Sequence, residues 1–237
     1  MLNGLDLFSG IGGLSLALRE WVIPIAYCEI DPYCQAVLLS RISNGLLPNR
    51  PIWDDVKTLQ GFDLRGSPDI IYGGFPCQDI SIAGNGKGLA GERSGLCYEI
   101  FRLTYEIKPR WIFLENVPAI TTRGGLEVVK EIAKMGFDCR WITITAASVG
   151  ALHKRERWFL LAHARCERFK EGAEKIQSER EKPIRKDFDK LCWGKDQSDM
   201  VRKGNGIPYQ LDRIRALGNA VVPAQAEKAF KILMGIK

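Results

Sequence analysis

The sequence predicts an α/β fold with a doubly wound, mostly parallel sheet and a small additional region late in the chain. Short apolar runs alternate with longer amphipathic stretches through residue 162, as strands alternate with helices in this class. Glycine turns follow the first and third apolar runs, where open α/β sheets bind their ligands. A hydrophobic fraction of 46% and a charged fraction of 26% exclude a disordered chain, and no apolar run approaches the ~20 residues of a membrane span.

The first part of the chain contains apolar runs that predict strands at 5–8, 23–30 and 69–72. A glycine turn separates the first of these runs from an expected helix at 14–20. A second helix is expected at 32–43 because Asp31 precedes Pro32, and these residue types favour an N-cap and the first helical position.

Later in the chain, further apolar runs predict strands at 111–115, 140–146 and 157–162. Apolar residues at helical spacing predict helices at 96–107 and 126–135. A glycine turn at 218–219 then precedes a last amphipathic helix, whose inner side is expected to carry Ala226, Phe230 and Leu233.

Residues 165–212 interrupt this alternation, because they are rich in charge and poor in apolar periodicity. They form either a small inserted subdomain or a mobile loop region. Residues 153–215 hold 17 basic and 11 acidic residues, which accounts for the whole net charge of +6. A localised basic surface is typical of a nucleic-acid partner, and the alternative is a solvated surface of mixed charge.

Seven cysteines, an odd number without any C-x-x-C pair, predict a reduced cytosolic protein without a structural metal. The first residues contain no basic segment followed by a long apolar one, so no secretory signal is expected there.

The first motif that points to chemistry is Asp-Leu-Phe-Ser-Gly-Ile-Gly-Gly-Leu at 6–14. Glycines permit positive φ angles and close approach of the backbone to a ligand. The motif is neither the dinucleotide fingerprint nor the phosphate loop, so a nucleoside without phosphates fits it better. The alternative is a tight packing turn.

Acidic residues follow the next predicted strands. Glu29 lies about 20 residues past the glycine turn, where an acid commonly accepts hydrogen bonds from ribose hydroxyls. Asp55 follows the next short segment and is a candidate acceptor for an adenine amino group. The alternative for each acid is a helix N-cap, which is the role expected of Asp31.

The string Gly-Gly-Phe-Pro-Cys-Gln at 73–78 places a thiol at the ligand-binding edge of the predicted sheet. Cys77 is therefore a candidate nucleophile, and the alternative is a small buried hydrophobe. Five glycines between residues 82 and 95 predict a mobile lid behind this thiol, or an ordinary surface loop.

Two further motifs carry charge at strand ends. Glu115 follows four apolar residues, so partial desolvation is expected to raise its pKa toward that of a useful acid. Arg155 and Arg157 lie two residues apart, so strand alternation places them on one face, where they suit a phosphate or a carbonyl oxygen. The alternatives are an acidic cap for Glu115 and surface pairing with Glu156 for the arginines.

In their order and spacing, these motifs resemble those of the cytosine carbon-5 DNA methyltransferases. Residues 6–13 match that family's S-adenosylmethionine (SAM) turn, Glu29 its ribose-binding acid and 55–56 its adenine-binding pair. Residues 74–78 match its catalytic motif, and residues 115–117 match its Glu-Asn-Val motif. Residues 155–157 match its paired-arginine motif, and residues 218–223 match its Gly-Asn-Ala-Val-x-Pro motif. The resemblance covers residues 3–163 and 212–237.

The resemblance implies that Cys77 adds to carbon 6 of a flipped-out cytosine, which makes carbon 5 reactive toward the methyl group of SAM. Glu115 then bonds ring nitrogen 3 and the exocyclic amine, while Arg155 and Arg157 hold the carbonyl oxygen at position 2. The implied cofactor contacts are Phe8, Gly10, Ile11, Gly12, Gly13, Glu29, Ile30, Asp55, Val56, Pro76 and Asn219. The implied DNA contacts are Gln78, Ser81, Lys87, Arg93, Arg202 and Lys203.

The same resemblance implies a catalytic domain of residues 1–163 plus 212–237 and a short basic target-recognition region at 164–211. It implies double-stranded DNA as the partner, S-adenosylhomocysteine as the product of the cofactor, a monomer, and a location in the cytoplasm away from membranes. A restriction endonuclease that acts separately is a further expected partner.

This sequence departs from the family pattern in two places. His153 stands where the family more often has Gln, and its ring can supply an equivalent hydrogen bond. The recognition interval is shorter than is typical, which predicts either a very short target site or poor selectivity. The alternatives are a transfer RNA methyltransferase, whose usual Cys-Phe-Thr string is absent here, and a silent DNA-binding relative, against which the intact Cys77 and Glu115 argue.

Overall fold

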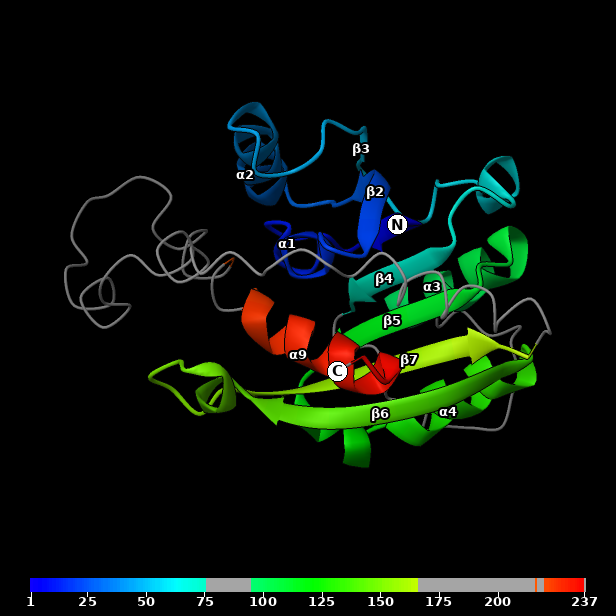
Figure 1. Cartoon of the computed structure of the whole chain (residues 1–237). Coiled ribbons are helices and arrows are strands. Elements are labelled where there is room, and N and C mark those ends of the chain that lie inside the picture. Colours follow the sequence, from blue (N-terminus) through cyan, green and yellow to red (C-terminus); the bar gives the residue numbers. More distant parts are fainter. Residues whose placement is uncertain (76–94, 166–215, 217–219, 237) are drawn as a thin grey trace.

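A single seven-stranded sheet runs through the computed structural model, which describes residues 1–75, 95–165, 216 and 220–236 (Figure 1). Its strand order is β3-β2-β1-β4-β5-β7-β6. The strands are β1 (Leu2–Leu7), β2 (Val22–Cys28), β3 (Ile52–Trp53), β4 (Ile70–Gly74), β5 (Trp111–Asn116), β6 (Phe137–Thr145) and β7 (Glu156–Ala164).

The direction of the strands confirms a mostly parallel sheet. Strands β1 to β5 pair in parallel, whereas β7 runs antiparallel to both of its neighbours, β5 and β6. Because β7 is reversed, its first residues lie at the edge where β4 and β5 end, and Trp158 pairs there with Asn116.

Helices cover both faces of the sheet, as a doubly wound fold requires (Figure 1). The helices are α1 (Gly13–Leu18), α2 (Pro32–Ser43), α3 (Leu96–Ile107), α4 (Gly125–Lys134) and α9 (Pro223–Met234), with 3-10 turns η1 (Gly61–Leu64), η3 (Pro118–Thr122) and η4 (Ala146–Val149). Helices α3 and α4 pack on one face, and α1 and α9 on the other.

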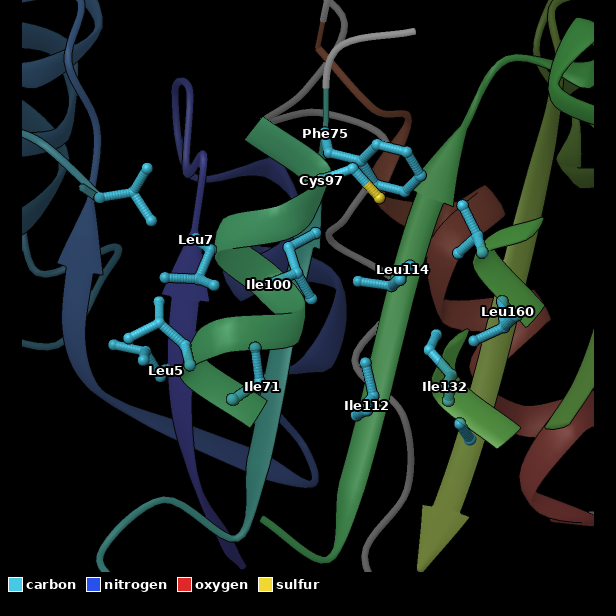
Figure 2. Packing of buried hydrophobic residues seen from close by; sticks show 14 of the residues in the cluster. Leu5, Leu7, Ile71, Phe75, Cys97, Ile100, Ile112, Leu114, Ile132 and Leu160 are labelled. Carbon is cyan, nitrogen blue, oxygen red and sulfur yellow. The ribbon is translucent and has the colours of Figure 1, made fainter. Parts of the chain in front are cut away.

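Alternate residues of each central strand enter two separate apolar clusters. Figure 2 shows Ile100 of α3 and Ile132 of α4 in the cluster on the first face, with Ile112 and Leu114 of β5 between them in this view. Phe113 points to the opposite face and belongs to the second cluster. Strands covered on both sides are apolar at nearly every position, which explains the long apolar runs in the sequence.

The last helix completes the second face. The ring centroid of Phe230 lies 5.3 Å from that of Phe113 and 5.5 Å from that of Trp21. Phe230 is fully buried, and burial of such a side chain stabilises a fold by roughly 1.5–3 kcal/mol. The expected inner positions Ala226, Phe230 and Leu233 are all buried.

Several element bounds agree with the sequence predictions. The helices expected at 32–43 and 96–107 have those bounds, and the side chain of Asp31 caps α2 by accepting the backbone N–H groups of Tyr33 and Cys34. Strand β3 was not expected, and β6 begins at Phe137 rather than at residue 140. Among the described cysteines, Cys28, Cys34 and Cys97 are buried and Cys139 is half-buried, as expected of small hydrophobes.

In the described part of the chain, the helices are too short and too polar for any of them to cross a membrane.

Candidate active site

The candidate site lies at the sheet edge where β1, β2, β4 and β5 end and β7 begins. The glycine turn follows β1, Glu29 follows β2, and Glu115 is the second-last residue of β5. Each of these positions is a strand end, so the fold itself brings the predicted residues to one edge.

The turn after β1 has positive φ angles at Phe8 (53°), Gly10 (53°) and Gly12 (82°). A Cβ atom at Gly10 would meet the carbonyl oxygen of Phe8 at an ordinary contact distance of 4.0 Å, so it is the backbone conformation that requires a glycine there. Gly13 is required for packing instead, because a Cβ atom there would lie 2.8 Å from Cγ1 of Val221. The turn is therefore both a ligand-accessible loop and a contact for the C-terminal segment.

Glu29 ties the glycine turn to the end of β2. Its Oε2 accepts the N–H of Gly10 at 2.7 Å, and its Oε1 accepts the N–H of Asp31 at 2.8 Å. An ionised carboxylate offers about four lone-pair sites, so acceptor capacity remains for the hydroxyls of a ribose. The neighbouring Ile30 is 68% exposed and presents an apolar surface beside that carboxylate. These residues fit a nucleoside.

The segment after β3 supplies the other expected cofactor contacts. The backbone N–H of Glu29 donates to the carbonyl oxygen of Trp53 at 2.9 Å, so the ends of β2 and β3 are adjacent. Asp55 follows directly and is half-buried, with Oδ1 accepting the N–H of Lys57 at 2.9 Å. Val56 is buried in the apolar cluster on the face of the sheet that α3 and α4 cover.

Glu115 is a buried carboxylate beside an arginine. Its side chain is 10% exposed, and Nε of Arg157 lies 2.6 Å from its Oε1. Burial raises the pKa of Glu115 to about 7, against the opposing positive charges of Arg157 and Arg155. A carboxyl group with this pKa holds or releases a proton near neutral pH, which suits acid or base catalysis. The predicted partial desolvation of Glu115 is confirmed.

Neighbouring glycines make room for this site. A Cβ atom at Gly74 would lie 2.7 Å from Oε2 of Glu115, and one at Gly73 would overlap the carbonyl oxygen of Leu7. The last two residues of β4 therefore have to be glycines for the strand to fit between β1 and β5.

The two arginines lie on one face of the chain, as their spacing predicts. Arg155 and Arg157 are half-buried, whereas Glu156 between them is exposed. The ion pair of Arg157 is with Glu115, and not the surface pair with Glu156 that the alternative interpretation expected. Nη2 of Arg155 donates to the carbonyl oxygen of Ala220 at 2.7 Å. Burial and the nearby charge of Arg157 lower the pKa of Arg155.

Asn116 is a positioning residue, a role that the sequence did not assign to it although it lies in the Glu-Asn-Val motif. Its Nδ2 donates to the carbonyl oxygen of Phe75 at 2.9 Å, and its Oδ1 accepts the N–H of Val117 at 2.8 Å. The buried amide thereby holds the chain two residues before Cys77. The signal for it was a polar residue next to Glu115 at the end of an apolar run.

Gln225 is a second residue that sequence reasoning missed. It is fully buried in α9, and its Nε2 donates to the carbonyl oxygens of Ile144 and Arg155. Together with the bond from Arg155 to Ala220, this amide fastens the C-terminal segment to the start of β7. A polar residue on the buried side of a helix must find such partners.

Replacing Gln225 by Leu is expected to lower the free energy of unfolding by about 1–3 kcal/mol, because the carbonyl oxygens of Ile144 and Arg155 lose their side-chain donor in a buried site. Urea denaturation followed by circular dichroism measures the change. The control is Gln60→Leu, since Gln60 is exposed and should change stability by no more than about 0.5 kcal/mol. Equal effects of the two changes would contradict the buried role.

Nine predicted site residues lie outside the described residues, so their placement carries no part of this geometry. They are Pro76, Cys77, Gln78, Ser81, Lys87, Arg93, Arg202, Lys203 and Asn219.

The chain is similar to known proteins in sequence and in fold. Residues 2–207 match the family described as C-5 cytosine-specific DNA methylase. The type II methyltransferase M.CviJI of Paramecium bursaria Chlorella virus IL3A is 32% identical over 95% of this chain and 58% of its own length. M2.BsuMI of Bacillus subtilis, also a type II methyltransferase, is 34% identical over 66% of this chain and 41% of its own length.

This chain therefore spans about half the length of these curated relatives. Among solved structures, the S. pombe Dnmt2 methyltransferase superposes with a TM-score of 0.57 at 20% identity, over 85% of this chain and 59% of that one. At that identity, the likeness supports the fold alone.

Proposed function

Because the chain belongs to the C-5 cytosine-specific DNA methylase family, we propose that it transfers a methyl group from SAM to carbon 5 of cytosine in duplex DNA. The observation that carries this proposal is the buried pair of Glu115 and Arg157 at the sheet edge. The same edge holds the glycine turn and Phe75, two residues before Cys77. A small-molecule methyltransferase would need the turn but not the carboxylate, the arginines and the Pro-Cys-Gln string.

SAM is the expected cofactor, and when bound it supplies an electrophilic methyl group. The glycine turn would receive its nucleoside, with Glu29 accepting from the ribose and Asp55 and Val56 meeting the adenine. The bond from Gly10 to Glu29 and the exposed side chain of Ile30 support this assignment. The remaining contacts in the proposal are Phe8, Ile11, Gly12, Gly13, Pro76 and Asn219.

The proposed chemistry begins when the thiolate of Cys77 adds to carbon 6 of a flipped-out cytosine, which makes carbon 5 nucleophilic. Glu115 would donate to ring nitrogen 3 as electrons reach the ring, a role that its raised pKa supports. Arg155 and Arg157 would hold the oxygen at position 2. After methyl transfer, water would take the carbon-5 proton, and the electron pair of that C–H bond would expel the thiolate of Cys77. Glu115 would take back the proton on nitrogen 3, which restores the aromatic ring.

The division of the chain belongs to the same proposal. Residues 1–163 and 212–237 would form the catalytic domain, which the packing of α9 beside α1 supports. Residues 164–211 would form a short recognition region, and its positive charge suits DNA. The proposed DNA contacts are Gln78, Ser81, Lys87, Arg93, Arg202 and Lys203. A monomer in the cytoplasm, with a separate restriction endonuclease as partner, completes the proposal.

The test incubates the protein with duplex DNA and tritiated-methyl SAM beside the Cys77→Ser variant, and then sequences the DNA for 5-methylcytosine. We expect label in the DNA with the unaltered protein and none with the variant, because serine is a far weaker nucleophile. Label at one short motif would mean that the short region reads sequence, and scattered label that it does not. Label in transfer RNA but not in DNA would overturn the assignment of DNA as the substrate.

A further inference from the structure

We propose that Arg102 is a positioning residue for the cofactor, because it holds the loop that carries Asp55 and Val56 against helix α3. Its Nη2 donates to the carbonyl oxygen of Val56 at 2.9 Å, and its Nη1 donates to that of Leu59 at 3.0 Å. The inference rests on the proposed function, since it takes Asp55 and Val56 to be the contacts for adenine.

The loop depends on this arginine because it has little regular structure of its own. Residues 54–60 contain no helix or strand, so the carbonyl groups of Val56 and Leu59 lack a ladder partner. The guanidinium group binds both of them from one rigid fork. Val56 and Leu59 are buried against α3, which leaves the half-buried Asp55 at the start of the loop.

Two acids in α3 fix the direction of the guanidinium group. Oε2 of Glu99 lies 2.7 Å from Nε of Arg102, and Oε2 of Glu106 lies 2.8 Å from its Nη1. The carboxylates are 13% and 11% exposed, so water screens these pairs less than it screens surface pairs. Glu106 also accepts the N–H of Gly61 at 2.9 Å, which anchors the far end of the same loop.

The held loop lies beside the expected ribose site. Strand β3 ends at Trp53, whose carbonyl oxygen accepts the N–H of Glu29. Asp55 is therefore two residues beyond a backbone contact with the ribose acid. A loop fixed at Val56 and Leu59 keeps Asp55 and Glu29 at a constant separation, and this pre-organisation is what a bound nucleoside requires.

The experiment compares Arg102→Met and Arg102→Lys with the unaltered protein. The first change removes every donor, and the second keeps the charge but cannot span both carbonyl groups. We expect both variants to raise the Kd and KM for SAM, by at least about tenfold for Met and less for Lys. The kcat at saturating SAM and the KM for DNA should stay within about twofold, because the proposal gives this loop a contact with adenine and none with DNA or the reacting carbon.

Direct titration of SAM separates the possible failures. If the unaltered protein binds no SAM, the proposed function fails and this inference fails with it. If the unaltered protein binds SAM and both variants bind it equally well, only the role of Arg102 is overturned. A fall in kcat without a rise in the KM for SAM would also overturn it, since that result indicates a general structural role. Arg19→Met is the control, because Arg19 lies at the surface near Glu20 and should alter none of these constants.

Discussion

Replacing Glu115 by Gln is expected to lower kcat for methyl transfer to cytosine by at least about 100-fold, the lower end of what a positioned acid contributes. Gln has nearly the same shape but cannot give a proton to ring nitrogen 3. Because its pKa is raised to about 7, Glu115 has such a proton to give near neutral pH, and the Gln variant does not. Steady-state methylation of duplex DNA measures kcat, and SAM titration reports whether the cofactor site is intact.

The pH dependence gives a second readout of the same residue. Because the pKa of Glu115 is raised to about 7, the group keeps its proton at lower pH and loses it as the pH rises through 7. The activity that depends on the protonated form should therefore fall on the alkaline side of pH 7. In the Gln variant, the small remaining activity should lack that decline.

A matched control is Glu131→Gln in α4, where the carboxylate forms a surface pair with Lys134 at 2.6 Å. This variant makes the same chemical change away from the sheet edge and should leave kcat unaltered. A Glu115→Gln protein that retains kcat within about threefold would show that the buried carboxyl group is not the acid.

The Asp6→Asn variant is expected to be more stable than the unaltered protein at pH 8, by up to about 4 kcal/mol. Asp6 is fully buried below the glycine turn, where its Oδ2 accepts the hydroxyl of Ser15, which in turn bonds the hydroxyl of Tyr72 at 2.7 Å. Burial raises the pKa of Asp6 from 3.8 to about 7, while the bonds from Ser15 and Ser9 oppose that rise.

The sign of the effect follows from which state holds the proton. Between about pH 4 and pH 7, folded Asp6 is protonated and unfolded Asp6 is ionised, so raising the pH favours unfolding. The stability contributed by the proton is complete below pH 4 and is lost as the pH passes 7. Asn imitates the protonated form at every pH, so the variant should show a smaller loss of stability between pH 5 and pH 8.

Urea denaturation at pH 5 and pH 8 tests this expectation. Glu115 has a raised pKa as well, so some decline with pH should remain in Asp6→Asn. The exposed Asp63 provides the control, since Asp63→Asn should leave the decline unchanged. A lower stability of Asp6→Asn than of the unaltered protein at pH 8 would mean that the ionised form is the native one.

The parts of the fold that the sequence predicts well are those with strong local signals. Helix α2 has the expected bounds because Asp31 and Pro32 define its first turn, and α3 because its apolar residues recur at helical spacing. Strand β3 has two residues, too few for any period to appear. Strand β6 starts at Phe137, three residues before the predicted start. The prediction missed these residues because the exposed Asp138 interrupts the apolar pattern.

The candidate site also has features that the local sequence predicts and features that it does not. The positions of Glu29 and Glu115 at strand ends follow from the local pattern. The pairing of Glu115 with Arg157 does not, because it arises from the antiparallel register between β5 and β7. Alternating strands and helices predict parallel neighbours, so a reversed strand inside the sheet is decided by packing over the whole domain. The bonds from Gln225 and Arg102 are equally non-local and could not be predicted.

Because α9 covers one face of the sheet and is near the end of the chain, that face is completed late during synthesis at the ribosome. Strand β7 ends at Ala164 and α9 begins at Pro223, so 58 residues are translated between them. At about 5–20 residues per second, that interval lasts roughly 3–12 s. During this time Phe113 and Phe159 lack the cover that α9 supplies through Phe230, although α1 on the same face and the helices on the opposite face can already pack. We therefore expect the nascent chain to expose part of this apolar face until α9 has been made.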